Sequence, residues 1–194
     1  MDCPSSHYEC MSLDDFEEFL ADKPNDQHWE LIGGRLARML AGSRWEHHYI
    51  AQNLGASLRE QLRQARAPCK VFVESFFLKD KATESATLPD VMVYCGPLPS
   101  GATFVSNPIV VAQVLSPGNE ARDRMEKWNL YQRMPSLRHF VLIARDRPRI
   151  EVFDRFKAKW SGPRILEGLN AFLELPAIDT PVSLREIYRD VISA

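Results

Sequence analysis

Two short apolar segments, each interrupted by one oxygen-bearing side chain, constrain this chain most. Residues 88–93 read Leu-Pro-Asp-Val-Met-Val, and residues 109–115 read Ile-Val-Val-Ala-Gln-Val-Leu. Both have the length and the β-branched content of buried strands. An isolated carboxylate among core residues is costly unless it is paired or binds a metal. If the two strands are neighbours, Asp90 and Gln113 would face one point and form a site for Mg²⁺.

Length and composition indicate one folded domain. The 194 residues are 45% hydrophobic and 26% charged, which is ordinary for a globular protein. We expect a single domain over residues 12–194, preceded by a flexible tail over residues 1–11. The net charge of −2 argues against a protein that coats nucleic acid non-specifically, but it leaves room for one basic cleft.

The four cysteines predict a reduced set of thiols, because their spacing matches neither a zinc site nor a Cys-x-x-Cys redox pair. They are Cys3, Cys10, Cys69 and Cys95. Cys69 and Cys95 are expected to be small buried residues within strands. The N-terminus has no signal-peptide pattern and no segment has the length of a membrane span, so we expect a cytoplasmic protein without membrane contact.

The order of predicted elements indicates an α+β fold, with a central mixed sheet flanked by helices. The predicted helices are 13–21 with Ser12 as N-cap, 45–66, Pro117 to 133 with Ser116 as N-cap, and a short one after Ser183. The predicted strands are 29–32 and 35–40 around Gly33-Gly34, 69–78, 90–94, 109–115, 138–144, 149–154 and 157–160. Residues 79–87 are predicted to be a mobile polar connection, and residues 96–107 a loop.

Several phrases in this order resemble a bacterial family of restriction endonucleases within the PD-(D/E)XK nuclease superfamily. They are Trp29-Glu30-Leu31-Ile32-Gly33-Gly34, Ser43-Arg44-Trp45-Glu46-His47, Leu88 to Val93, Gln113 to Pro117, Asp123-Arg124-Met125-Glu126-Lys127 with Tyr131, and Leu173-Glu174-Leu175-Pro176. The resemblance covers about Leu13 to Tyr188. It implies the restriction-endonuclease-like fold and a metal site, holding Mg²⁺ or Mn²⁺, that activates water for phosphodiester hydrolysis.

The resemblance also implies roles for individual residues. Asp90 lies where the family has its first metal-binding Asp, and Gln113 where the family usually has Glu. The superfamily's standard lysine position is Leu115 here, and Lys127 matches the lysine thought to replace it. Glu30 matches an acidic residue from the N-terminal part.

His47 matches a family histidine near the site, although a histidine at a helix start is more often a surface residue. Two positions depart from the family pattern. Gln113 is neutral where the family is anionic, and Ser75 lies where many relatives have Asp. Mg²⁺ is held largely by anionic oxygens, so the loss of charge at Gln113 should weaken metal binding, although an amide carbonyl can still coordinate.

Each candidate also has a purely structural interpretation. Asp90 after Pro89 could belong to a turn, and Gln113 could be a buried amide bonded to the backbone. Lys127 could form a surface ion pair with Asp123, four residues earlier. Glu30 could face solvent from a strand whose neighbours face the core.

Two functions are therefore open. The first is a Mg²⁺-dependent DNA endonuclease that acts as a homodimer, with Asp90 and Gln113 as metal ligands and Lys127 and Glu30 as further catalytic residues. The second is a catalytically degenerate protein that keeps the nuclease fold and binds DNA or another protein. The neutral Gln113, the Ser75 position and the mild acidity of the chain favour the second.

Overall fold

The structure is a computed structural model that describes residues 10–24, 27–38, 44–115 and 122–192. Most of the predicted N-terminal tail lies outside these residues, and so do Ser116 and Pro117. None of the described helices is both long enough and apolar enough to cross a membrane.

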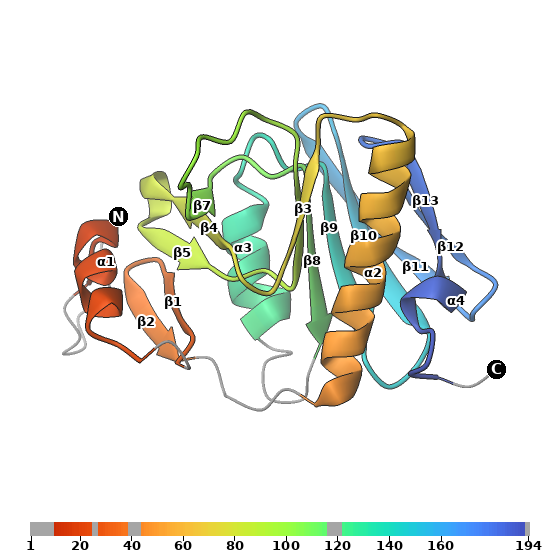
Figure 1. The fold of residues 1–194 in the computed structure, drawn as a ribbon, viewed down its shortest axis with the longest axis horizontal. Helices are drawn as coiled ribbons and strands as arrows, with labels where there is room; N and C mark the ends of the chain where they lie inside the picture. Colours follow the sequence, from red (N-terminus) through yellow and green to blue (C-terminus); the bar gives the residue numbers. More distant parts are fainter. Residues whose placement is uncertain (1–9, 25–26, 39–43, 116–121, 193–194) are drawn as a thin grey trace.

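A six-stranded mixed sheet forms the larger part of the fold (Figure 1). Its strands, in spatial order, are β11 (Lys159–Glu167), β10 (Arg149–Phe156), β9 (His139–Ala144), β8 (Val110–Leu115), β6 (Val91–Tyr94) and β3 (Lys70–Val73). β8 and β9 run parallel, and the other neighbours run antiparallel. The predicted α+β fold with a mixed sheet is therefore confirmed.

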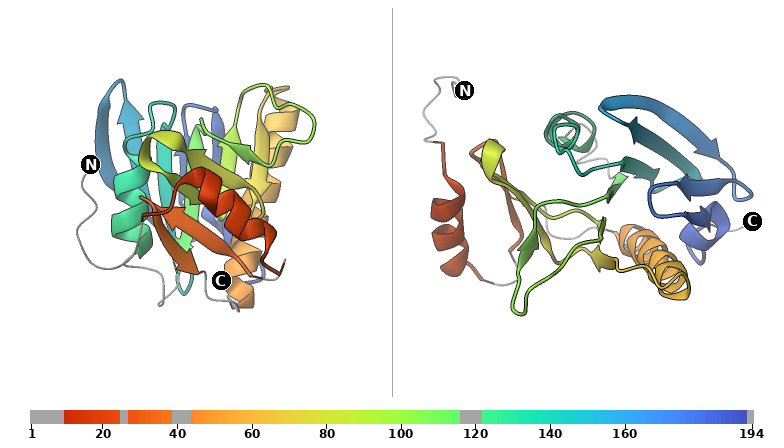
Figure 2. Two further views of the ribbon diagram at one scale, coloured as in Figure 1. Left: turned by 90° about the vertical axis from the view of Figure 1, so that its left-hand side faces the viewer. Right: turned by 90° about the horizontal axis from the view of Figure 1, so that it is seen from above.

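Helices cover both faces of this sheet. The side chains of each strand alternate between the two faces, and each face carries an apolar cluster that a helix buries. Val91 and Val93 lie in the cluster with α2 (Trp45–Gln64) and α4 (Leu184–Ile187). The hairpin of β12 (Phe172–Leu175) and β13 (Thr180–Ser183) adds to that cluster. Met92 lies in the opposite cluster with α3 (Trp128–Tyr131). The view from above in Figure 2 shows α2 and α3 on opposite sides of the strands.

A second sheet of five strands was not predicted. Its strands, in spatial order, are β2 (Arg35–Arg38), β1 (Trp29–Ile32), β5 (Ser85–Thr87), β4 (Phe77–Asp80) and β7 (Phe104–Val105). α1 (Leu13–Ala21) packs against it, with Phe16 buried and its ring 6.1 Å from that of Phe77. The predicted Ser12 cap of α1 is confirmed, because the Ser12 side chain accepts a hydrogen bond from the Asp15 N–H.

The prediction of one strand over residues 69–78 is wrong. β3 ends at Val73 and β4 begins at Phe77, and the two strands belong to different sheets. Between them Glu74 has a left-handed backbone conformation, with φ of +54°. This break turns the chain from one sheet into the other at the edge where both sheets approach the predicted site.

The prediction of a mobile connection over residues 79–87 is also wrong. The segment contains the end of β4, the 3-10 turn η1 (Lys81–Thr83) and β5, and Ser85 and Thr87 are fully buried. Ser85 Oγ accepts a hydrogen bond from Gly33 N–H (2.9 Å), and Thr87 Oγ1 accepts one from Tyr131 O–H (3.0 Å). A polar segment is buried here because its hydroxyls are satisfied by residues distant in sequence.

Cys69 and Cys95 are not the free thiols that the sequence suggested. They are joined in a disulfide across the neighbouring strands β3 and β6, where they continue the pairing of Lys70 with Tyr94. The expectation rested on spacing along the chain, whereas the pairing arises from the antiparallel register of two strands 26 residues apart in sequence.

Candidate metal centre

Asp90 lies at the start of β6 and is 5% exposed, so it is not a surface turn residue. Its Oδ2 accepts a hydrogen bond of 2.6 Å from the Val114 N–H of β8. Its Oδ1 lies 3.1 Å from His47 Nε2, on the first turn of α2. The backbone therefore fixes one carboxylate oxygen, and the other points at the imidazole.

Glu74 reaches the same point from the break between β3 and β4. Its Oε1 lies 3.5 Å from His47 Nε2, and its Oε2 lies 2.9 Å from His48 Nδ1. Its N–H donates to the Asp90 carbonyl (3.1 Å), which ties the break to the start of β6. The arrangement of Glu74 resembles that of Asp90, since one carboxylate oxygen contacts a residue outside the triad, His48, and the other oxygen faces His47.

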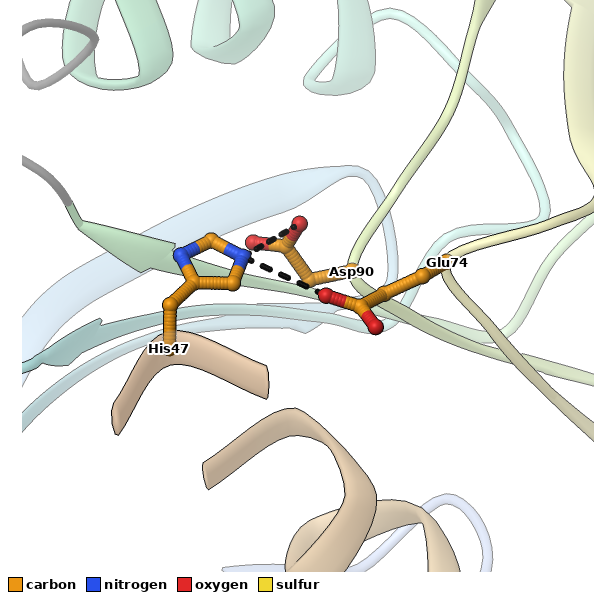
Figure 3. Close-up of side chains that lie close together, drawn as sticks. All are labelled: His47, Glu74 and Asp90. Atoms are coloured by element: carbon orange, nitrogen blue, oxygen red, sulfur yellow. Dashed lines mark ion pairs between the residues drawn. The ribbon is translucent and has the colours of Figure 1, made fainter. Parts of the chain in front are cut away.

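His47, Glu74 and Asp90 converge so that one ligand atom of each lies within 4.8 Å of the others (Figure 3). Ligands about 2.1 Å from a cation and about 90° apart lie about 3 Å from one another. The two measured nitrogen–oxygen distances of 3.1 and 3.5 Å are close to that value. One imidazole and two carboxylates also balance a divalent charge, so these residues fit a divalent cation.

A second buried group lies beside this triad. Lys127 Nζ is 3.0 Å from Glu30 Oε1 and 3.5 Å from Gln113 Oε1. Glu30 Oε1 also accepts a hydrogen bond of 2.9 Å from the Leu88 N–H. All three side chains are buried, with residue exposures of 2% or less. The surface and solvent-facing interpretations of Lys127 and Glu30 are therefore excluded, and the Asp123 side chain lies outside the described part.

The backbone joins the two groups. Asp90 and Gln113 continue the antiparallel register in which Val91 pairs with Ala112. The Leu88 N–H donates a hydrogen bond to Glu30, and Asp90, two residues later, contacts His47 within the triad. Gln113 directs its carbonyl oxygen at Lys127, and among the described residues its Nε2 has no hydrogen-bond partner. The predicted residues thus lie at one edge of the sheet, in two adjacent groups.

The helix that carries Lys127 is held to the sheet by a two-point ion pair. Arg124 Nη1 and Nη2 donate to the two Glu151 oxygens of β10, at 2.7 and 3.0 Å. Hydrogen bonds from Arg124 keep the pKa of the Glu151 carboxyl below its usual value. Arg124 and Lys127 belong to a π-helical turn, η2 (Arg122–Lys127), that leads into α3, and such turns are frequent at functional sites.

Glu74 is the residue that the sequence analysis missed. Attention fell on Ser75, whose hydroxyl donates to the Val73 carbonyl (3.1 Å). Residues 69–78 gave no sign of a break, since the left-handed position is occupied by Glu rather than Gly or Asn. The acidic side chain at this point is therefore that of Glu74, one position before Ser75.

Comparison with known proteins gives the same family along most of the chain. The profile of the Uma2 family, described as "Putative restriction endonuclease", matches residues 13–184. Two proteins of Synechocystis sp. (strain ATCC 27184 / PCC 6803 / Kazusa) are each 27% identical. Uncharacterized protein slr1290 aligns over 96% of this chain and 95% of its own length, and uncharacterized protein sll1609 over 75% and 82%.

A solved structure from Anabaena variabilis ATCC 29413, titled as a putative nuclease belonging to DUF820, has a similar fold. The TM-score is 0.75 at 15% identity, and the match covers 94% of this chain and 99% of that chain. The fold thus agrees with that of a protein titled a putative nuclease, and the profile covers both groups of the site. This chain belongs to the Uma2 family of restriction-endonuclease-like proteins.

Proposed function

We propose that this protein is a divalent-metal-dependent endonuclease that hydrolyses phosphodiester bonds in DNA. The observation that carries the proposal is the convergence of His47, Glu74 and Asp90 beside a buried lysine. A family described as restriction endonucleases makes DNA the expected substrate. Mg²⁺ or Mn²⁺, when bound, would supply a polarised water and charge to offset the scissile phosphate.

The side chains of the site would bind the metal, stabilise the transition state and position the lysine. Asp90 and Glu74 present one oxygen each toward His47 while their other oxygens are held by Val114 and His48. Lys127 would stabilise the charge that develops on the phosphate in the transition state. Glu30 and Gln113 would position the Lys127 ammonium, because both side-chain oxygens lie within 3.5 Å of it.

The proposal extends to assembly and location. Cutting both strands of a duplex is served by a two-fold homodimer, in which each subunit acts on one strand. A nuclease acting on DNA inside a bacterial cell would work in the cytoplasm. Most thiols are reduced there, so we expect the Cys69–Cys95 disulfide to be dispensable for cleavage.

The test is cleavage of supercoiled plasmid with Mg²⁺ or Mn²⁺ by wild type, Asp90→Asn and Lys127→Met. We expect wild type to cut and both variants to lose at least 100-fold in rate, with metal affinity kept by Lys127→Met. Glu60→Gln is the control, since Glu60 is exposed on α2 and its partners within the described part of the chain, Arg63 and Gln64, belong to the same helix. Wild type that binds metal and DNA without cutting would favour the degenerate binding protein.

A further inference from the structure

We infer that His47 is a direct nitrogen ligand of the bound cation, and that the site therefore takes a first-row transition ion such as Mn²⁺ in preference to Mg²⁺. This inference rests on the proposed function, because it concerns the cation that the proposed reaction would use. It differs from the expectation from sequence, in which Asp90 and Gln113 supplied an oxygen-only site.

The two carboxylates each direct one oxygen toward the imidazole of His47. Asp90 Oδ2 is engaged by the Val114 N–H and Glu74 Oε2 by His48, and the two remaining oxygens both face His47 Nε2. Figure 3 shows these two oxygens on the same side of the imidazole ring. A cation held by both oxygens would therefore have the Nε2 atom within its coordination shell.

The helix that carries the imidazole is fixed against β3. The His47 side chain is 12% exposed, and it stands on α2, which packs closely on β3. At Gly55 of α2, a Cβ atom would lie 2.4 Å from Val73 Cγ2, so the close approach requires glycine. Val73 directly precedes Glu74. The contact between α2 and β3 thus fixes the distance between the helix that carries His47 and the break that carries Glu74.

The chemistry of the three donor atoms favours a transition ion over Mg²⁺. Mg²⁺ prefers oxygen ligands and keeps several waters, whereas imidazole nitrogen favours the later divalent ions. A set of one nitrogen and two carboxylate oxygens accepts Mn²⁺ readily, and affinity should increase further toward Co²⁺ and Zn²⁺ along the Irving–Williams order. We therefore expect Mn²⁺ to bind at least about tenfold more tightly than Mg²⁺.

Mn²⁺ itself is the probe for a nitrogen ligand, through electron spin-echo envelope modulation, which detects ¹⁴N bound directly to the ion. We expect strong ¹⁴N modulation in the wild-type complex and its loss in His47→Gln, whose amide offers oxygen in place of nitrogen. The control is His48→Gln, which removes the adjacent imidazole that contacts Glu74 and should keep the modulation. Wild-type protein without ¹⁴N modulation, or His47→Gln that retains it, would overturn the inference.

Calorimetric titration of wild type with Mn²⁺ and with Mg²⁺ gives the second readout. The dissociation constant for Mg²⁺ divided by that for Mn²⁺ should fall severalfold in His47→Gln. It should stay close to the wild-type value in His28→Gln, which removes an exposed imidazole that is not one of the three candidate ligands. Equal affinities for Mn²⁺ and Mg²⁺ in wild type would contradict the inference. Nitrogen-bound Mn²⁺ without DNA cleavage would refute the proposed function alone, whereas cleavage without nitrogen coupling would refute the inference alone.

Discussion

Lys127 Nζ lies 3.0 Å from Glu30 Oε1, and the two side chains are only 3% and 1% exposed. A fully buried ion pair is weak evidence for stability, because desolvation offsets most of the attraction. The pair lies beside the candidate metal ligands and joins an N-terminal strand to the helix after β8. We infer that its role is to position the Lys127 ammonium so that it can stabilise charge on the phosphate in the transition state.

Lys127→Met should destabilise the protein by about 3–5 kcal/mol, since it leaves Glu30 as an uncompensated buried charge. Urea unfolding in metal-free buffer measures this loss. The double variant Glu30→Gln/Lys127→Met removes both charges and should recover much of the loss. If the double variant loses the sum of the two single effects, the two charges are not coupled, and the ion pair is not the reason for the burial.

Gln113→Glu tests whether residue 113 can reach the metal. It places a carboxylate opposite Asp90 in the strand register, so metal-free protein should lose stability through repulsion. Added Mg²⁺ should restore that loss by binding only the folded state, and cleavage should appear or increase. Thermal unfolding with and without Mg²⁺ measures both effects. Unchanged metal affinity would mean that residue 113 serves only to hold Lys127.

Arg124→Met should lower the rate of DNA cleavage by about tenfold or more without changing metal affinity. Arg124 anchors the turn that carries Lys127 to Glu151 of β10, whereas the metal ligands stand on other elements. Arg124→Lys should restore the rate only in part, because lysine cannot make the two-point contact. The measurement is cleavage rate and Mn²⁺ affinity on the same preparations. Equal rates for wild type and Arg124→Met would refute the anchoring role.

His139 should make stability depend on pH. It is 4% exposed, its Nδ1 lies 2.8 Å from Asp154 Oδ1, and its Nε2 accepts the Ala177 N–H. Burial lowers the pKa of His139 below 6.5, against the opposing effect of Asp154. Below pH 6.5 the unfolded chain therefore binds more protons than the folded one at this residue, so stability should fall as the pH falls.

Urea midpoints of wild type and His139→Gln, measured from pH 8 to pH 5, test this prediction. The midpoint of wild type should decrease more steeply below pH 6.5 than that of the variant, which lacks the titrating ring. Parallel curves for the two proteins would show that His139 does not contribute to the pH dependence.

The sequence predicted the parts of the fold that local pattern determines. The apolar stripe of α2, the Ser12 and Ser183 caps and the strands around Asp90 and Gln113 all formed as expected. The strands that follow Asp90 and contain Gln113 are neighbours in the sheet, as the sequence analysis supposed. The roles of Lys127 and Glu30 came from family resemblance, and the structure places both side chains in one buried group next to Asp90.

The parts that were missed depend on contacts between distant segments. Glu74 adopts a left-handed conformation in a segment that alternates like a strand, because the chain there leaves one sheet for another. Ser85 and Thr87 are polar and yet buried, because their hydroxyls find hydrogen-bond partners in Gly33 and Tyr131. The Cys69–Cys95 disulfide likewise follows from strand register. Local propensity carries no information on such pairings.

We propose that His47, Glu74 and Asp90 together hold the cation. The most direct measurement is an anomalous difference map from a crystal of wild-type protein soaked in Mn²⁺. We expect a single strong peak about 2.1–2.3 Å from His47 Nε2, Asp90 Oδ1 and Glu74 Oε1. A peak bound by Asp90 and Gln113 without His47 and Glu74, or no peak at this edge of the sheet, would contradict it.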